Sequence, residues 1–110
     1  MAAATQKHVL IRARALIANR NSWTRRAFAR TAQGRTIAWN DALARRWCAV
    51  GAIRRAALEL GQDTAQAERI ADNVVKLVQR GRWFPRLVTI NDFSSHGHVL
   101  ARIDRAIERL

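Results

Sequence analysis

The chain has 110 residues, a length that suits one domain spanning residues 1–110 and argues against two. Its apolar content of 49% supplies one modest core, and its net charge is +12. A single cysteine, Cys48, excludes an internal disulfide, and no apolar run approaches the roughly 18 residues of a membrane span. We therefore expect a protein of a reducing, cytoplasmic compartment with no membrane contact, whose residues 1–6 are disordered.

Composition favours helices over sheet. The chain contains 21 alanines but only five glycines and one proline. Alanine has the highest helix propensity, whereas glycine and proline interrupt helical runs. The predicted fold class is mostly α: a single compact four-helix domain, with a small two-stranded ribbon between the first two helices.

The first predicted helix begins after Thr5 and ends near Asn19. One apolar stripe at helical spacing supports it, formed by Val9, Leu10, Ala13, Leu16 and Ile17. A loop follows, and then Phe28 and Ile37 flank a glycine-containing turn at residues 31–35. That pattern predicts the two-stranded ribbon, which is stable only when it packs against helices.

The second predicted helix is capped by Asn40 or Asp41 and runs to about Leu60, before Gly61. Its apolar face is interrupted by Arg46 and Arg54. Long basic side chains in that position either extend to the edge of the face or line a pocket. The sequence allows both interpretations for Arg46 and Arg54.

The third predicted helix starts at Asp63 or Thr64 and ends at Gly81. Its stripe is the most regular in the chain: Ala67, Ile70, Ala71, Val74, Leu77 and Val78. After Pro85, two groups of capping residues, at 91–92 and 94–95, precede the fourth predicted helix, which continues to the C-terminus.

Charge is distributed unevenly along the chain. Residues 1–58 hold twelve of the twenty basic residues and one acid, Asp41, for a net +11, while the remainder carries +1. Eighteen of the basic residues are arginines, a ratio that genomic base composition can explain. Base composition does not explain why acids are missing from one half. An organelle presequence would also lack acids, but this stretch has the pattern of folded structure. A polyanion or an acidic surface is the expected partner.

Arginines alternate with aromatic residues between Arg20 and Trp39. This pattern suits phosphate contacts combined with base stacking, although buried tryptophans beside solvated arginines would give the same sequence. The predicted nucleic-acid-binding residues are Arg20, Arg25, Arg26, Arg30, Arg35, Arg45, Arg46, Arg54 and Arg55. A second basic and aromatic cluster lies at residues 80–86. Its pattern favours a helix end capped by Gly81 over a second site for phosphate contacts.

Catalytic and metal-binding patterns are weak. Asp92, His96 and His98 resemble a partial metal site, and Cys48 would need one of these histidines as an activating base. A lone cysteine among apolar residues usually contributes packing. We therefore expect no enzymatic activity, no catalytic residue, no metal and no cofactor.

One helix motif and its surroundings resemble a known family. The residues and segments that carry the resemblance are Trp23, Ala27-Phe28-Ala29-Arg30 with Gly34, Ala44-Arg45-Arg46-Trp47-Cys48-Ala49-Val50-Gly51-Ala52, Asn91-Asp92 and Val99-Leu100-Ala101-Arg102-Ile103-Asp104-Arg105-Ala106. In these segments the chain is similar to a family of small bacterial and phage proteins known only as a domain of unknown function. The resemblance spans roughly residues 10–107. It implies one compact helical domain in which Trp47, Cys48 and Gly51 are structural, with Gly51 permitting close helix contact, and it implies no activity.

Two functional hypotheses follow. The leading one is a non-enzymatic, nucleic-acid-associated accessory or regulatory protein whose N-terminal half contacts phosphates. The alternative is a protein-binding module or mobile-element inhibitor that docks its basic face on an acidic protein surface. A third possibility is self-association through the first two helices. The sequence does not distinguish DNA from RNA and does not indicate an oligomeric state.

Overall fold

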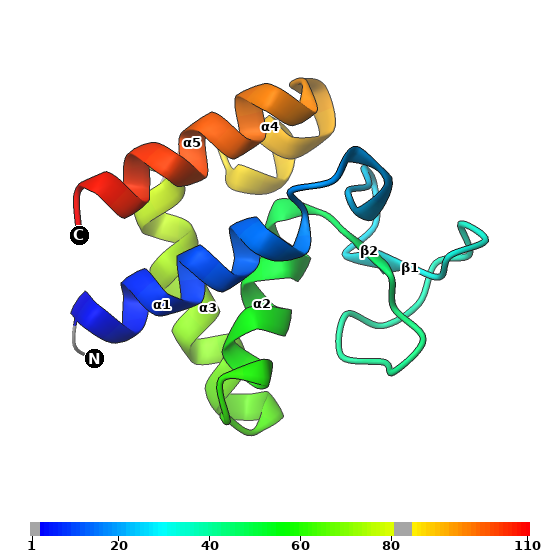
Figure 1. The fold of residues 1–110 in the computed structure, drawn as a ribbon, viewed down its shortest axis with the longest axis horizontal. Helices are drawn as coiled ribbons and strands as arrows, with labels where there is room; N and C mark the ends of the chain where they lie inside the picture. The colour runs from blue at the N-terminus through cyan, green and yellow to red at the C-terminus, as the bar shows by residue number, and fades with distance from the viewer. Residues whose placement is uncertain (1–2, 81–84) are drawn as a thin grey trace.

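The computed structural model describes residues 3–80 and 85–110, and Figure 1 shows how their helices and strands are arranged. Within these residues the chain forms five α-helices, where four were expected. The elements in order are α1 (Ala3–Leu16), a 3-10 helix η1 (Arg20–Ser22), β1 (Ala29–Arg30), β2 (Arg46–Trp47), α2 (Ala49–Glu59), α3 (Thr64–Gln79), α4 (Leu87–Phe93) and α5 (His96–Glu108). The mostly helical class is confirmed, together with one small antiparallel sheet between α1 and α2.

Most of the predicted stripe is buried: Val9, Leu10 and Ala13 of α1, and Ile17 directly after it, have at most 1% of their surface exposed, whereas Leu16 is partly buried. Helix α1 begins at Ala3, so its first turn overlaps the segment expected to be disordered, of which residues 1–2 lie outside the described part. It ends before Asn19 because the Asn19 side chain accepts a hydrogen bond from the backbone N–H of Asn21 at 2.8 Å. Asn19 thereby caps η1 instead of extending α1.

The two-stranded sheet pairs different segments from those expected. The turn at residues 31–35 does form, with the Thr31 N–H donating to the Arg35 carbonyl at 2.8 Å. Beyond it, however, only an isolated bridge joins Arg30 to Thr36. The regular partner of β1 is β2, in the register Ala29 with Trp47 and Arg30 with Arg46. Strand β1 has two edges. Thr36 bridges to one of them, and the segment around the aromatic Trp47, which is distant in sequence, pairs with the other.

Helix α2 starts seven or eight residues later than predicted, depending on which of the two predicted caps is taken. The Asp41 carboxylate accepts the N–H of Leu43 at 2.8 Å and closes a local turn, so it does not cap a helix. The N-cap is Cys48, whose Sγ accepts the N–H of Gly51 at 3.3 Å. The predicted end near Gly61 is confirmed, because the helix stops at Glu59 and Gly61 has a φ of +98°.

Helix α3 follows its prediction closely. Asp63 is the N-cap and accepts the N–H of Gln66 at 2.8 Å. The buried positions are Ala67, Ala71, Val74 and Val78. The helix ends at Gln79, followed by Arg80 in the left-handed conformation, while the predicted stop at Gly81 lies outside the described residues.

Helix α4 is the element that the sequence pattern did not predict. Asn91 and Asp92 were expected to cap the last helix, but they lie inside α4, where Leu87, Ile90 and Asn91 face the interior. The last helix, α5, is capped by Ser95, which belongs to the second predicted group and accepts the N–H of His98 at 3.1 Å.

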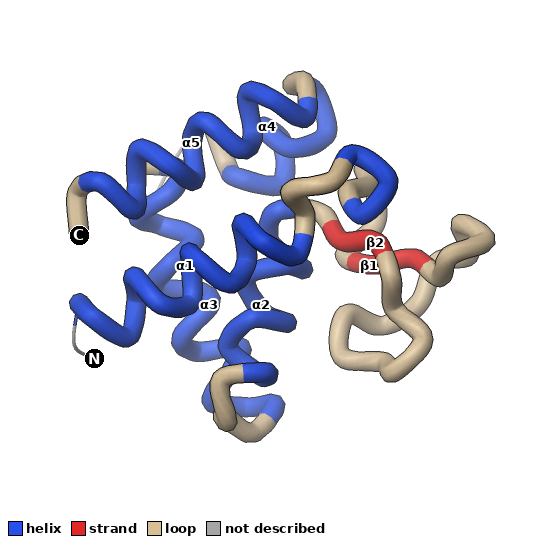
Figure 2. Tube along the Cα trace, viewed as in Figure 1, coloured by secondary structure: helices blue, strands red, loops and turns tan. Residues whose placement is uncertain are grey.

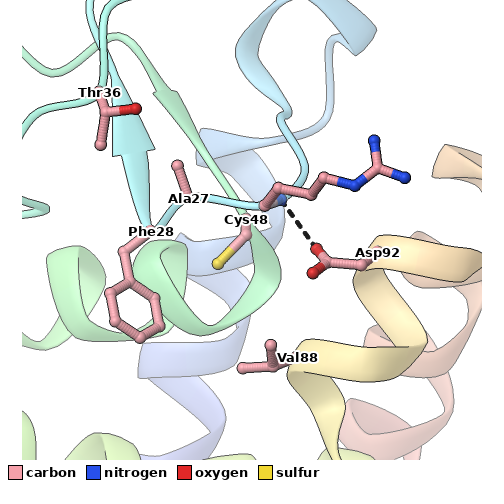
Figure 3. Close-up of a pocket in the computed structure, with 7 residues that line it drawn as sticks. Ala27, Phe28, Thr36, Cys48, Val88 and Asp92 are labelled. Atoms are coloured by element: carbon pink, nitrogen blue, oxygen red, sulfur yellow. Dashed lines mark hydrogen bonds between the residues drawn. The ribbon is translucent and has the colours of Figure 1, made fainter.

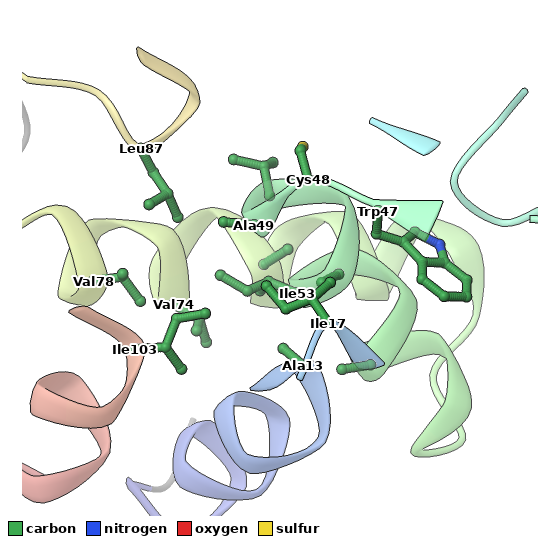
Figure 4. Close-up of a cluster of buried hydrophobic side chains, with 14 of the residues drawn as sticks. Ala13, Ile17, Trp47, Cys48, Ala49, Ile53, Val74, Val78, Leu87 and Ile103 are labelled. Atoms are coloured by element: carbon green, nitrogen blue, oxygen red, sulfur yellow. The ribbon is translucent and has the colours of Figure 1, made fainter. Parts of the chain in front are cut away.

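Buried apolar side chains from all five helices and from the segment between α1 and α2 join one cluster, part of which Figure 4 shows. Helix α1 packs against α2 and α5, and α3 packs against the same two helices. Many of the buried side chains are alanines, such as Ala52, Ala56 and Ala71, which let helix backbones approach closely. Within the described residues, no helix combines the length and apolar character needed to cross a bilayer.

Candidate functional site

The segment between α1 and α2, residues 20–48, forms what we call the loop lobe. It contains η1, β1, β2 and extended loops, and Figure 2 shows it as mainly irregular chain. In Figure 1 it lies at the right end of the molecule, opposite both termini. Seven of the nine predicted binding arginines belong to it, namely Arg20, Arg25, Arg26, Arg30, Arg35, Arg45 and Arg46, while its sequence has one acid, Asp41. The fold therefore gathers most of the predicted site at one end of the protein.

Arg30 is an internal clamp of the lobe. Its guanidinium donates to the hydroxyls of Thr24 and Thr36 at 2.9 and 3.1 Å, and to the carbonyls of Gly34 and Arg25 at 3.1 and 3.2 Å. These four bonds tie the turn at residues 31–35 to the chain before β1. Because all four acceptors are neutral, Arg30 keeps its positive charge while it organises the lobe.

Arg45 and Arg46 are also held by neutral acceptors. Arg45 donates to the carbonyls of Ala42 and Ala44 at 2.7 and 2.8 Å, and Arg46 donates to the carbonyl of Ala32 at 2.9 Å. The Arg46 contact joins β2 to the turn. Arg46 was expected either to extend to the edge of a helix face or to line a pocket. Its side chain instead links β2 to the turn at residues 31–35.

Arg20, Arg25, Arg26 and Arg35 are exposed. Arg25 is oriented by the lobe and by the end of α4, since its guanidinium lies 4.7 Å from the Trp23 ring centroid and donates to the Ser94 carbonyl at 2.5 Å. Within the described ranges, the side chains of Arg20, Arg26 and Arg35 make no hydrogen bond or ion pair. These exposed side chains are the ones most available to an external anion.

The helix arginines are partly neutralised, unlike those of the lobe. Arg12 and Arg55 both contact Glu59, at 2.7 and 3.4 Å, and Arg14 pairs with Asp104 at 2.8 Å. The hydrogen bond to Asp104 raises the pKa of the Arg14 guanidinium above its ordinary value. No lobe arginine forms an ion pair with a carboxylate in the described part of the chain. In the described residues, all seven arginines of the lobe are therefore without an ion pair, whereas on α1 only Lys7 lacks one.

Arg54 and Arg55 lie on α2, next to the lobe, and their side chains have different surroundings. Arg55 donates to the carbonyls of Asp41 and Trp39 at 2.8 and 3.3 Å, which fastens the lobe to α2. Arg54 lies over the Phe28 ring at 4.9 Å and lines a hollow of about 230 Å³ that also includes Asp72. Of the two readings of Arg54, the pocket-lining one is therefore confirmed.

A second hollow, of about 500 Å³, lies between the loop lobe and α4. Figure 3 shows its residues: Ala27, Phe28 and Thr36 come from the lobe, Cys48 from the start of α2, and Val88 and Asp92 from α4. Phe28 and Val88 remain 41% and 42% exposed although both are apolar. The lining thus has an apolar part, Phe28, Val88 and the Cys48 thiol, which we call the base, and a polar part, Arg26, Thr36 and Asp92, which we call the rim.

Arg26 forms one rim of this hollow in an unusual backbone conformation. Its φ is +62°, a left-handed value that a residue other than glycine adopts only when its surroundings hold it there. The surroundings here include Asp92, whose Oδ1 accepts the Arg26 N–H at 2.9 Å, drawn as the dashed line in Figure 3. Asp92 thereby positions the lobe segment around Arg26 against α4.

Cys48 contributes a neutral thiol to the base of the hollow. It is 4% exposed, and burial raises the pKa of its thiol to about 11 despite the opposing hydrogen bonds from Gly51 and Val50. The thiol is therefore protonated at neutral pH. His96, one of the two bases considered for its activation, is engaged elsewhere, since Nε2 lies 2.6 Å from the Ile17 carbonyl and the ring lies 5.3 Å from that of Trp23.

The remaining sequence candidates have simpler outcomes. In the residues that the structure describes, no group of three or more His, Cys, Asp or Glu side chains is placed to hold a metal ion. Most of the second basic cluster, residues 81–84, lies outside the described part. Gly51 permits a close contact, but with the backbone of the lobe: a Cβ at this position would overlap the Phe28 carbonyl oxygen. The close helix contact implied by the family resemblance is thus a contact between a helix and a strand segment.

Asn91 and Asp92 were treated as caps in the sequence, although they help to build the site. Asn91 is the buried polar residue of the core, with 0% of its surface exposed. The spacing of Leu87, Ile90 and Asn91 at i, i+3 and i+4 was the available signal, because it places the amide on the inner face of a helix.

The fold and the lobe together define a small helical protein with an arginine-rich end. A family described as a family of unknown function (DUF6197) matches residues 1–109, and the chain belongs to this family. Comparison with curated proteins and with solved structures gives no match.

Proposed function

We propose that the protein is a non-enzymatic, nucleic-acid-associated accessory or regulatory factor that contacts backbone phosphates through the loop lobe. The observation that carries this proposal is the set of seven lobe arginines, none of which forms an ion pair with a carboxylate in the described residues. Arginine is suited to phosphate because its planar fork donates two parallel hydrogen bonds and its charge persists at every physiological pH.

The lobe arginines divide into two roles in this proposal. Arg30, Arg45 and Arg46 shape the loops through carbonyl and hydroxyl acceptors and add to the positive field. Arg20, Arg25, Arg26 and Arg35 are exposed and make the phosphate contacts. Arg54 and Arg55, which lie on α2 next to the lobe, contribute to the field and not to direct contacts.

Salt dependence tests the phosphate contacts directly. For one phosphate contact from each of these four exposed arginines, the slope of log affinity against log salt concentration on duplex DNA is about −3.6, and each lost contact reduces its magnitude by about 0.9. We expect Arg35→Ala to reduce the slope by about that amount. The matched control is Arg69→Ala, which removes an exposed arginine from α3, outside the lobe.

Two results would count against the proposal. One is the absence of any DNA or RNA binding at low salt. The other is an equal effect of Arg35→Ala and Arg69→Ala, which would mean that net charge matters and the lobe does not.

A second candidate function is a protein-binding module or mobile-element inhibitor that docks on an acidic protein surface. The specific observation in its favour is that Phe28 and Leu43, 41% and 63% exposed, lie among the lobe arginines. Aromatic residues and arginine are enriched at interface hot spots. Affinity capture from nuclease-treated lysate separates the two candidates, because a partner bridged by nucleic acid disappears after treatment. The bacterial or phage source and the cytoplasmic location remain predictions.

A further inference from the structure

The hollow between the loop lobe and α4 differs in chemistry from the basic surface around it. Its base is formed by Phe28, Val88 and the thiol of Cys48. Because burial keeps that thiol protonated, the base carries no charge at neutral pH. A phosphate group would lose its hydration there without gaining a partner, whereas a flat neutral ring would gain apolar contact.

Polar groups at the rim suit a ring that has hydrogen-bonding edges. The Asp92 carboxylate can accept from a ring amine, and the Thr36 hydroxyl can donate or accept. The Arg26 side chain lines the same rim, while its backbone is fixed by the bond to Asp92. The rim therefore supplies a hydrogen-bond acceptor from Asp92 and a positive charge from Arg26, and both lie around the apolar base.

The size and surroundings of the hollow agree with this chemistry. A volume of about 500 Å³ lies within the range of small-molecule sites. Exposed arginines of the lobe, Arg25 and Arg26, stand beside its rim, in the sequence immediately before the lining residues Ala27 and Phe28. An anionic backbone that crosses the lobe would thus bring its attached bases to the opening.

We propose that this hollow receives one unstacked base of a single-stranded nucleic acid whose phosphates lie along the lobe arginines. The proposal rests on the proposed function and adds to it a preference for single strands. A base in a duplex is stacked and paired, so it reaches such a hollow only after both interactions are broken. Bases of a single strand are already free to stack on aromatic side chains, as in other single-strand-binding proteins.

Filling the hollow tests the proposal. Val88 is 42% exposed on α4, so Val88→Trp fills the hollow from its apolar base without removing a core side chain. The matched control is Thr89→Trp, an exposed neighbouring position of α4 that does not line the hollow. The probes are labelled single-stranded DNA and RNA oligonucleotides, the same sequences as duplexes, and a single strand in which all bases are replaced by abasic sites. Binding is measured by fluorescence anisotropy at constant salt.

We expect the wild type to bind the single strands about tenfold more tightly than the abasic strand, since base stacking typically contributes 5- to 150-fold per base. Val88→Trp should remove this difference and leave duplex binding and the salt slope unchanged. Thr89→Trp should behave as the wild type.

The possible failures are distinguishable. If Val88→Trp and the wild type bind every probe equally, the base-binding hollow is overturned while the phosphate-binding lobe stands. If no probe binds at low salt, both proposals are overturned. If Val88→Trp abolishes a nuclease-resistant protein partner and leaves oligonucleotide binding unchanged, the hollow belongs to a side chain of that partner, and the base-binding proposal is wrong.

Discussion

The indole N–H of Trp23 donates to the Oδ1 of Asn91 at 2.7 Å, and this bond joins the loop lobe to α4 across 68 positions of sequence. The same Oδ1 accepts the N–H of Ala49 at 2.9 Å, and the Asn91 Nδ2 donates to the Thr24 carbonyl at 3.0 Å. One fully buried amide thus connects the start of the lobe, the first turn of α2 and the middle of α4. These three segments also surround the hollow, so its shape depends on this amide.

Replacing Asn91 with alanine should destabilise the fold strongly. The change leaves the Trp23 indole, the Ala49 N–H and the Thr24 carbonyl without their partner, and each buried unpaired group costs about 1–3 kcal/mol. We expect the free energy of unfolding to fall by on the order of 3 kcal/mol in urea denaturation. Asn73→Ala, at an exposed position of α3, serves as the control and should change it by less than about 0.5 kcal/mol. Similar losses for both variants would show that Asn91 has no special role.

Gly51 should tolerate no side chain. A Cβ at this position would overlap the Phe28 carbonyl oxygen, a backbone atom fixed by its bond from the Cys48 N–H. Gly51→Ala should therefore lower the free energy of unfolding by about 3 kcal/mol, as overpacked sites do. Gly97 in α5 is the matched control because a Cβ there meets nothing within 4 Å, and Gly97→Ala should be neutral or stabilise by up to about 1 kcal/mol. Thermal denaturation of the two variants decides the point, and equal shifts would contradict the close-contact explanation.

The sequence predicted those helices whose signals are local. The caps Asp63 and Ser95 lie within three residues of the N–H groups that they accept, and the stripes of α3 and α5 repeat within each helix. Residues 40–47 were assigned to a helix because their apolar spacing allowed it. Pairing of Arg46 and Trp47 with β1, a contact between segments distant in sequence, overrides that spacing.

The candidate site was partly predictable for the same reason. Seven of the nine arginines share one lobe because they are close in sequence. Their separate roles depend on which acceptors the fold brings near: Arg30 donates to four, whereas the side chain of Arg35 has no partner among the described residues. The hollow depends on α4, whose residues are distant in sequence from the lobe, and no local pattern connects the two.

Arg30→Lys should loosen the lobe although the charge is unchanged. Lysine carries three donors on one atom and cannot reproduce a planar fork that reaches Thr24, Gly34, Thr36 and the Arg25 carbonyl together. We expect faster amide hydrogen exchange in residues 29–37, by about tenfold or more, which corresponds to a local loss of about 1.4 kcal/mol. Arg35→Lys is the control and should leave exchange unchanged. Equal exchange rates in the two variants would remove the clamp role from Arg30.

Cys48 should make the stability of the protein depend on alkaline pH. Burial raises the pKa of its thiol from the ordinary 9.0 to about 11, so the fold favours the protonated form. The corresponding stabilisation is complete below the ordinary pKa and is lost as the pH rises through about 11, at up to about 1.4 kcal/mol for each pH unit in that window. Urea denaturation between pH 8 and 11 should therefore show a steeper decline for the wild type than for Cys48→Ala, which loses the helix cap at every pH but has no thiol to ionise. Parallel declines would mean that the thiol reaches water when it ionises and is less shielded than the 4% exposure of Cys48 indicates.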